Sequence, residues 1–389
     1  MQLTLRDKIS LFAHMLQDDL FPRLQQSAEV WTKEHQRVAA VLALVPMRRY
    51  IPVARGWNGR PAKDRCAVAC AFTAKAVLNL ATTRQLLERL KIDKTLRQLC
   101  GWDSEAQLPH ESTFSRAFGE FADTQLAQCV HEALIRDTQR DRLIGHIARD
   151  STAIAARERF PKTKAQKRAE RARKKARVSM KGKKVPHMSR QAKRAKQTER
   201  TRTARQRSLT VAQALAELPR VCSIGAKADS HGNIKYWRGY KLHLDVADGQ
   251  IPITAVLTSA SVHDSMLAIP MANISSERVT YCYELMDAAY DAQAIREHSR
   301  QLGHVPIIDA KTPAGRPTAL PLLRKLKREF TPAEAIRYRE RTMVERVYSR
   351  LKDEFGGGVV RVRGAEKVMA HLMFGVLALT VDQLLRLSG

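Results

Sequence analysis

The sequence contains few acidic residues for its length. Across 389 residues, 39 Asp and Glu stand against 68 Lys and Arg, which gives a formal net charge of +29. The protein is therefore strongly basic, neither acidic nor balanced in charge. A surplus of this size indicates a polyanionic partner such as nucleic acid.

Cysteine is scarce, and its spacing excludes two common kinds of site. The six cysteines are Cys66, Cys70, Cys100, Cys129, Cys222 and Cys282. None of them forms the CxxC pair that zinc ribbons and thioredoxin-like redox motifs require. We therefore expect reduced, buried thiols.

Long apolar runs are missing as well. The longest run, 373–381, is too short to cross a bilayer, and the N-terminus carries charges within its first seven residues. We therefore expect no membrane partner and a cytoplasmic protein, associated with the nucleoid only through DNA.

Hydrophobic residues at 44% and charged residues at 28% are typical of a globular protein, and the length suggests two or three domains.

The positive charge is concentrated in one stretch. Residues 157–207 hold 22 Lys or Arg and three Glu, which is 19 of the 29 net positive charges. This basic insertion has almost no large apolar residues, so by itself it predicts a solvated helix or arm that nucleic acid would order. We expect it to clamp DNA, although a nonspecific tether, a localisation-like run or an RNA-binding arm would have the same composition. The candidate contacts are Lys174, Lys175, Lys183 and Lys184.

Helical patterns precede the insertion. We expect a mostly helical N-terminal segment over 1–61 and a helical, helix-turn-helix-like domain over 62–140. In the second unit one helix opens with a capping box at Thr82, and the next starts near Asp93 and stops at Gly101. The last helix of such a unit could enter a DNA groove, but small helical bundles without a DNA role share the pattern.

The rest of the chain has the pattern of an α/β domain with a mixed sheet. The expected elements are strands at 143–154, 240–246, 251–257 and 281–285, a helix from about 291, a strand at 305–309, and helices at about 332–355 and 361–389. This order is that of a ribonuclease-H-like fold. We predict such a catalytic domain over 141–156 and 208–360, followed by a C-terminal helix over 361–389.

Two aspartates occupy the strand ends of that fold. Asp150 lies near the end of the first strand and Asp287 ends the fourth, and these strands are neighbours at the centre of a ribonuclease-H-like sheet. Asp291 competes with Asp287, but we expect it to cap the following helix. For His243, and likewise for His263 and Asp264, structural hydrogen bonding is the expected role.

The helix predicted at about 332–355 adds a polar face. Tyr338, Arg341, Glu345 and Lys352 lie at offsets of 0, 3, 7 and 14 residues, which places them within about 60° of arc on an ideal α-helix. A solvated surface would also be polar, so this face alone does not establish a site.

These residues and their surroundings resemble a known family. The spacing Tyr-x2-Arg-x3-Glu-x6-Lys matches the YREK signature of bacterial insertion-sequence DDE transposases of the insertion-sequence-four/five-like superfamily. The segments RDST at 149–152, GYKLHLDVADG at 239–249 and MDAAYDA at 286–292 are similar to the corresponding family segments. The resemblance covers about residues 62–385.

The resemblance implies a site and its partners. Asp150, Asp287 and Glu345 would form the catalytic triad that binds two divalent ions, Mg²⁺ or Mn²⁺, while Tyr338, Arg341 and Lys352 would contact DNA at the ends of the element. Carboxylates suit this role because such ions prefer hard, anionic oxygen ligands. Two ends must be joined, so we expect a dimer on the terminal inverted repeats and the target DNA. A same-fold nuclease without strand transfer and a domesticated DNA- or RNA-binding protein are the alternatives.

Overall fold

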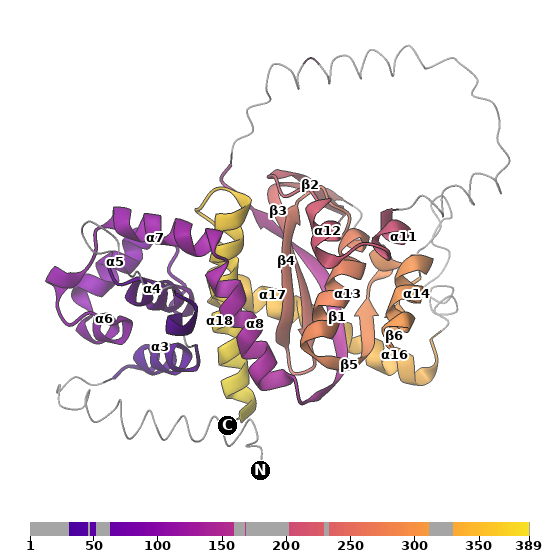
Figure 1. Ribbon diagram of the computed structural model, residues 1–389, viewed down its shortest axis with the longest axis horizontal. Helices are drawn as coiled ribbons and strands as arrows, with labels where there is room; N and C mark the ends of the chain where they lie inside the picture. The colour runs from indigo at the N-terminus through magenta and orange to yellow at the C-terminus, as the bar shows by residue number, and fades with distance from the viewer. Residues whose placement is uncertain are drawn as a thin grey trace.

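The chain is described by a computed structural model over residues 31–45, 47–51, 63–158, 168, 202–228, 233–310 and 330–388. The long C-terminal helix α18 (Ala365–Ser388) separates most of the N-terminal helices from the sheet, as Figure 1 shows. Lys174, Lys175, Lys183 and Lys184 of the basic insertion lie outside the described residues, so their role stays a prediction. The domain boundaries expected from the sequence also stay predictions.

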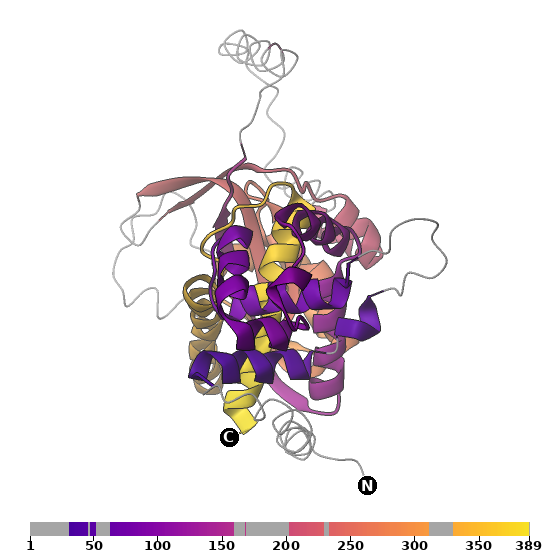
Figure 2. The same ribbon diagram turned by 90° about the vertical axis from the view of Figure 1, so that its left-hand side faces the viewer.

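The N-terminal helices follow the caps expected from the sequence. They are α3 (Lys33–Leu44), α4 (Arg65–Val77), α5 (Thr83–Ile92), α6 (Lys94–Cys100), α7 (Glu111–Asp123) and α8 (Leu126–Gln139), with 3₁₀ turns η2 (Met47–Tyr50) and η3 (Glu105–Gln107). Thr82 and Gln85 form the predicted capping box of α5, and Asp93 caps α6. Gly101 ends α6 at φ 104°, where a left-handed backbone favours glycine. Figure 2 shows these helices packed in front of α18.

A six-stranded mixed sheet lies on the other side of α18. Its strands are β1 (Leu143–Ala155), β2 (Ser223–Ala228), β3 (Ile234–Ala247), β4 (Ile251–Ser259), β5 (Thr280–Met286) and β6 (Val305–Ile308). β1 is antiparallel to β3 and parallel to β5, and β6 is parallel to β5. β2 pairs with the first half of β3 and β4 with the second half. β3 and β4 thus form a hairpin, and the predicted pairing of the first and fourth expected strands is confirmed.

Helices cover both faces of this sheet. The remaining elements are α11 (Arg202–Gln206), α12 (Val211–Ala216), α13 (Ala268–Arg278), α14 (Gln293–Gln301), α16 (Pro332–Tyr338), α17 (Met343–Glu354), η4 (Asp264–Leu267), η5 (Ala288–Tyr290) and η6 (Arg339–Thr342). α13 and α14 pack side by side on one face, and α17 packs on β1 and β3 from the other. The candidate triad must be sought on the α17 face.

The prediction of one continuous helix over 332–355 is wrong. Its start at Pro332 is as expected, and Thr331 and Glu334 form a capping box there, but η6 interrupts the α-helix between α16 and α17. A 3₁₀ turn advances each residue by about 120° instead of 100°. The angular positions computed for Tyr338 and Arg341 relative to Glu345 on an ideal helix therefore do not apply across η6.

The core is continuous between the two regions. One buried apolar cluster runs from α4 and α7 through α18 to β1, β3 and α17. α18 is long and apolar enough to cross a membrane by length and composition, but 89% of its most apolar 18-residue window is buried inside the protein. Such burial is typical of a core helix. The expectation that all six thiols are buried is wrong, since only Cys100 and Cys222 are.

Candidate active site

The register of the central strands brings two aspartates together. Arg149 on β1 pairs with Met286 on the parallel strand β5, so Asp150 and Asp287 follow at equivalent positions. Side chains of adjacent positions in a strand alternate between faces, and paired residues of neighbouring strands share a face. Asp150 and Asp287 therefore leave the sheet on the face opposite Arg149.

Local hydrogen bonds fix both carboxylates. The Ser151 amide donates to Oδ1 of Asp150 at 2.7 Å, and the Ala289 amide donates to Oδ1 of Asp287 at 2.9 Å. Asp287 thus caps η5, the turn that follows β5. The expectation that Asp291 caps the next helix is wrong, because Ala292 is the N-cap of α14 and Asp291 accepts from Arg296 at 2.9 Å.

One buried tyrosine attaches α17 to the strand that carries Asp150. The Tyr348 hydroxyl donates to the Asp150 carbonyl at 2.6 Å and lies 3.2 Å from the Leu242 carbonyl, while the Leu244 amide donates to it at 3.0 Å. Its hydroxyl therefore bridges α17, β1 and β3 at the height of the first aspartate. Val344, Val347 and Leu351 complete the buried face of the helix.

The polar residues of η6 and α17 lie along the same face of β1. The Arg341 guanidinium donates to Glu345 at 3.0 Å and lies 4.0 Å from Oδ2 of Asp150, so it connects the two carboxylates. Lys352 donates to the Thr152 hydroxyl at 2.7 Å, two residues along β1 from Asp150. The ring of Tyr338 lies 6.0 Å from the Arg341 guanidinium. All four residues of the candidate signature thus lie within one connected region.

Burial perturbs the two aspartates, and a neighbouring carboxylate adds to the effect on each, Asp287 for Asp150 and Asp264 for Asp287. Burial raises the pKa of Asp150 to about 6, and the neighbouring Asp287 carboxylate adds to the rise, while the Ser151 amide, Lys227 and Arg341 oppose it. Burial also raises the pKa of Asp287 above its usual value, against the effect of the Ala289 amide and Arg341. Two desolvated carboxylates side by side favour a proton or a cation between them.

The third carboxylate differs in its environment. The Glu345 side chain is 55% exposed and is paired with Arg341. In the part of the chain that the structure describes, no three His, Cys, Asp or Glu side chains gather closely enough to hold a metal ion. The structure thus brings Asp150 and Asp287 together and connects Glu345 to Asp150 through a guanidinium.

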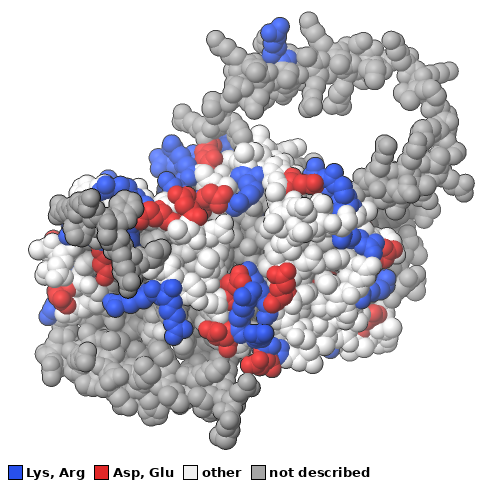
Figure 3. Space-filling model, viewed as in Figure 1, with Lys and Arg blue, Asp and Glu red and all other residues white. Residues whose placement is uncertain are grey.

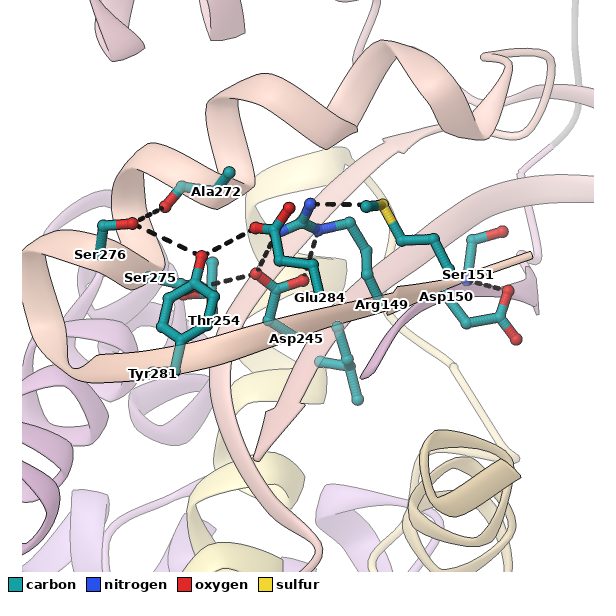
Figure 4. A network of polar contacts seen from close by, with 12 residues as sticks. Arg149, Asp150, Ser151, Asp245, Thr254, Ala272, Ser275, Ser276, Tyr281 and Glu284 are labelled. Atoms are coloured by element: carbon teal, nitrogen blue, oxygen red, sulfur yellow. Dashed lines mark hydrogen bonds and ion pairs between the residues drawn. The ribbon is translucent and has the colours of Figure 1, made fainter. Parts of the chain in front are cut away.

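A buried ion network supports the site from the opposite face of the sheet. Figure 4 shows Arg149 pointing toward Asp245 and Glu284, away from Asp150. Arg149 binds Asp245 in a bidentate manner at 2.7 and 2.8 Å and lies 3.4 Å from Glu284. All three are at most 1% exposed. They belong to β1, β3 and β5, so the network fixes these strands relative to one another immediately before Asp150.

Sequence reasoning missed three contributors to this region. Tyr348 and the residues of the Arg149 network belong to no recognisable sequence motif. A single tyrosine in an amphipathic helix, or a charged residue in a buried strand, can have many structural roles, so neither was identified from the sequence. Lys227 on β2 was also missed. Its charge opposes the rise in the pKa of Asp150 and, after burial, contributes to the lowered pKa of Lys352. Only the pairing of β2 with β3 places it near the site.

Other candidates have the structural roles expected of them. His243 is buried and hydrogen-bonds the Thr258 hydroxyl at 2.9 Å, and burial lowers its pKa to about 4. His263 hydrogen-bonds the Ser265 hydroxyl, and Asp264 accepts from Lys241 at 2.8 Å.

Two family models match the chain. A Transposase DDE domain model matches residues 141–381, and a Transposase domain (DUF772) model matches residues 26–120. The first covers more than half of the chain and contains Asp150, Asp287 and Glu345. The chain belongs to the DDE transposase family. No curated protein matches it.

Membership of the DDE transposases agrees with the architecture. The sheet order, with β1 between the antiparallel β3 and the parallel β5, is that of the ribonuclease-H-like fold expected for this family. DDE transposases are enzymes that cleave and join DNA. Both the helical region and the sheet region therefore fall within segments that are typical of transposases.

Proposed function

We propose that this DDE transposase cuts and joins the ends of its own insertion sequence, with Asp150, Asp287 and Glu345 as the catalytic carboxylates. One observation carries the proposal. Asp150 within β1 and Asp287 directly after β5 lie on the same face of the sheet, burial raises the pKa of both, and Arg341 connects Asp150 to Glu345 on α17. The family match to residues 141–381 supports it.

The side chains in this region fit divalent metal ions. Asp150 and Asp287 offer anionic oxygens that repel each other and are short of solvent, and the Arg341 guanidinium shows that the space beside Asp150 accommodates a cation. Hard oxygen ligands of this kind suit Mg²⁺ or Mn²⁺. Two bound ions would activate the attacking water or 3′-hydroxyl and stabilise the leaving 3′-oxygen. Asp150, Asp287 and Glu345 would hold them.

The cations beside the carboxylates would orient the DNA. Arg341 and Lys352 flank Asp150 along β1, and a charged donor on each side suits two phosphates of one strand. Release of Glu345 from Arg341 would free the carboxylate for a metal ion and the guanidinium for a phosphate. Tyr338 offers an aromatic face on which a displaced base could stack.

The remaining partners follow from the reaction. The substrates are the terminal inverted repeats and the target DNA, and the basic insertion, including Lys174, Lys175, Lys183 and Lys184, would clamp the flanking duplex. Because two ends are joined in one event, the active complex would contain two copies of the chain. A protein of this kind acts where the DNA is, in the bacterial cytoplasm.

The test is cleavage and joining of labelled DNA that carries the element's own ends, in Mg²⁺ or Mn²⁺. The native chain should nick the end and transfer the 3′-hydroxyl, whereas Glu345→Ala and Asp287→Ala should bind the same DNA without cutting it. Glu340→Ala is the matched control for the α17 change, because Glu340 is exposed on η6 and its nearest described cation, Arg346, is 3.9 Å away. That variant should cut normally.

Each alternative predicts a different outcome. Cutting without joining by the native chain would identify a nuclease of the same fold. Binding with no metal-dependent cutting in any variant would identify a DNA-binding protein. Equal activity of Glu345→Ala and the native chain would remove Glu345 from the triad.

A further inference from the structure

A second basic site lies between the N-terminal helices and the start of α18. A pocket of about 640 Å³ opens between α4, α5, α7, the start of α18 and the segment that precedes α18. Its six basic lining residues are Lys75, Arg84, Arg157, Arg361, Arg363 and Lys367. Its one carboxylate, Glu111, lies 3.7 Å from Arg84. On the face drawn in Figure 3, basic and acidic side chains are interspersed, so six cations around one pocket are unlike that surface.

Lys75 is the basic residue of this pocket that is buried. It lies in the last turn of α4 and is only 7% exposed, and burial lowers its pKa to about 8. Over the described parts of the chain, neither a carboxylate nor a hydrogen-bond acceptor partners its ammonium group. Phe72 and Phe118, with ring centroids 4.8 Å apart, line the same pocket. An ammonium group that is largely removed from water and has no partner is costly, and because Lys75 lines the pocket, an anion from outside the chain can reach it.

The surroundings increase the positive character of the site. The first turn of α5 lines the pocket, and the N-terminal end of a helix carries partial positive charge. His371 of α18 also lines it, and its Nε2 donates to the Gly356 carbonyl at 3.0 Å. Burial and the Lys75 cation lower the pKa of His371 to about 4, so this imidazole is neutral at pH 7. The side-chain charge of the pocket at pH 7 therefore comes from Lys and Arg and not from His371.

Three distant segments of the chain build the pocket. Glu158, just after β1, accepts hydrogen bonds from the Gly364 amide and the Tyr240 hydroxyl, both at 2.8 Å. This carboxylate ties the end of β1 to the segment 361–364 that leads into α18. Arg157 and the two arginines of that segment are thereby held opposite Lys75 of α4. The arrangement is part of the fold and does not depend on one exposed side chain.

From this geometry we propose that the pocket binds a backbone phosphate of the DNA on which the carboxylates act, with Lys75 as its central ligand. The inference rests on the proposed function for the identity of the DNA, and it adds a docking point outside the catalytic face. β1 connects the two sites, because Asp150 lies on this strand and Arg157 follows its end. The five residue steps of strand from Asp150 to Ala155 span about 17 Å, or about five base pairs of duplex DNA. One duplex can therefore reach both sites.

The test measures affinity for a labelled duplex as a function of salt, with the full chain. Lys75→Met keeps the length of the side chain and removes the charge. We expect it to weaken binding by about tenfold and to lower the slope of log K against log salt by about 0.9, the value for one lost phosphate contact. Arg363→Gln should act in the same direction. Lys91→Met, at an exposed lysine of α5 outside the pocket, controls for the loss of one charge.

The outcomes separate this inference from the proposed function. Lys75→Met should melt no lower than the native chain, because it removes a buried charge, so weaker binding cannot be ascribed to unfolding. Equal affinity and equal salt slope in Lys75→Met, Lys91→Met and the native chain would overturn the proposal. Inorganic phosphate could raise the melting temperature of the native chain while Lys75→Met still binds DNA normally. That result would assign the pocket to a free anion and would also overturn the proposal. If Lys75→Met weakens DNA binding but the native chain cleaves no DNA, the catalytic assignment is wrong and the proposal for the pocket is supported.

Discussion

Replacing Asp150 with asparagine should stabilise the fold while it abolishes DNA cleavage. The side chain has a pKa of about 6 in the folded protein, against 3.8 for an unperturbed aspartate. The folded state therefore binds the proton more tightly than the unfolded state does. As the pH rises from below 3.8 to above 6, ionisation of Asp150 therefore lowers the free energy of unfolding. Asparagine does not ionise, so the variant does not lose this stability.

The size of the effect follows from the shift. About two pKa units correspond to about 3 kcal/mol at pH 7.5, and the same calculation gives about 1.6 kcal/mol at pH 5.0, where the native carboxyl is largely protonated. Burial of the site makes solvent screening small. The asparagine oxygen can still accept from the Ser151 amide, so the change in charge is the main perturbation.

Urea denaturation at the two pH values measures this prediction directly. Asp150→Asn should be more stable than the native chain at both, and the difference should be larger at pH 7.5. Asp123→Asn, at an exposed position in the last turn of α7, should leave stability unchanged. A variant less stable than the native chain at pH 7.5, or a difference that does not grow with pH, would refute the electrostatic account of this site.

Three further changes test the surroundings of the site. Mn²⁺ at about one hundred times its dissociation constant should stabilise the native chain by about 2.7 kcal/mol in a thermal melt. An equally large stabilisation of Asp150→Asn by Mn²⁺ would mean that Asp150 is not a metal ligand. Asp245→Asn leaves the buried Arg149 with less compensation, so urea denaturation should show a loss of about 3–5 kcal/mol; a loss below about 1 kcal/mol would show that the network contributes little. Tyr348→Phe removes the hydroxyl that joins α17 to β1 and β3, and we expect a loss of about 1–3 kcal/mol together with slower cleavage at unchanged DNA affinity. Unchanged cleavage by this variant would mean that α17 is positioned without the hydroxyl.

Much of the fold follows from short-range pattern. The capping box at Thr82 and the stop at Gly101 depend on residues within a few positions of each other, and both are confirmed. The break at η6 was not predictable, because Pro332 and the capping box specify where a helix begins and not how its later turns adjust to a sheet.

By itself the sequence determined the order of the elements, the placement of Asp150 in the first strand and of Asp287 at the end of the fourth, and the excess of positive charge, because periodicity, caps and composition are local properties. Only the tertiary structure decided that Arg341 lies between Asp150 and Glu345, that Arg149 is compensated by two acids from neighbouring strands, and that Lys75 is buried without a described anion. The physical reason is distance along the chain. Each of these environments depends on packing between residues that are tens to hundreds of positions apart, and burial changes the energy of a charge far more than any neighbour in sequence does.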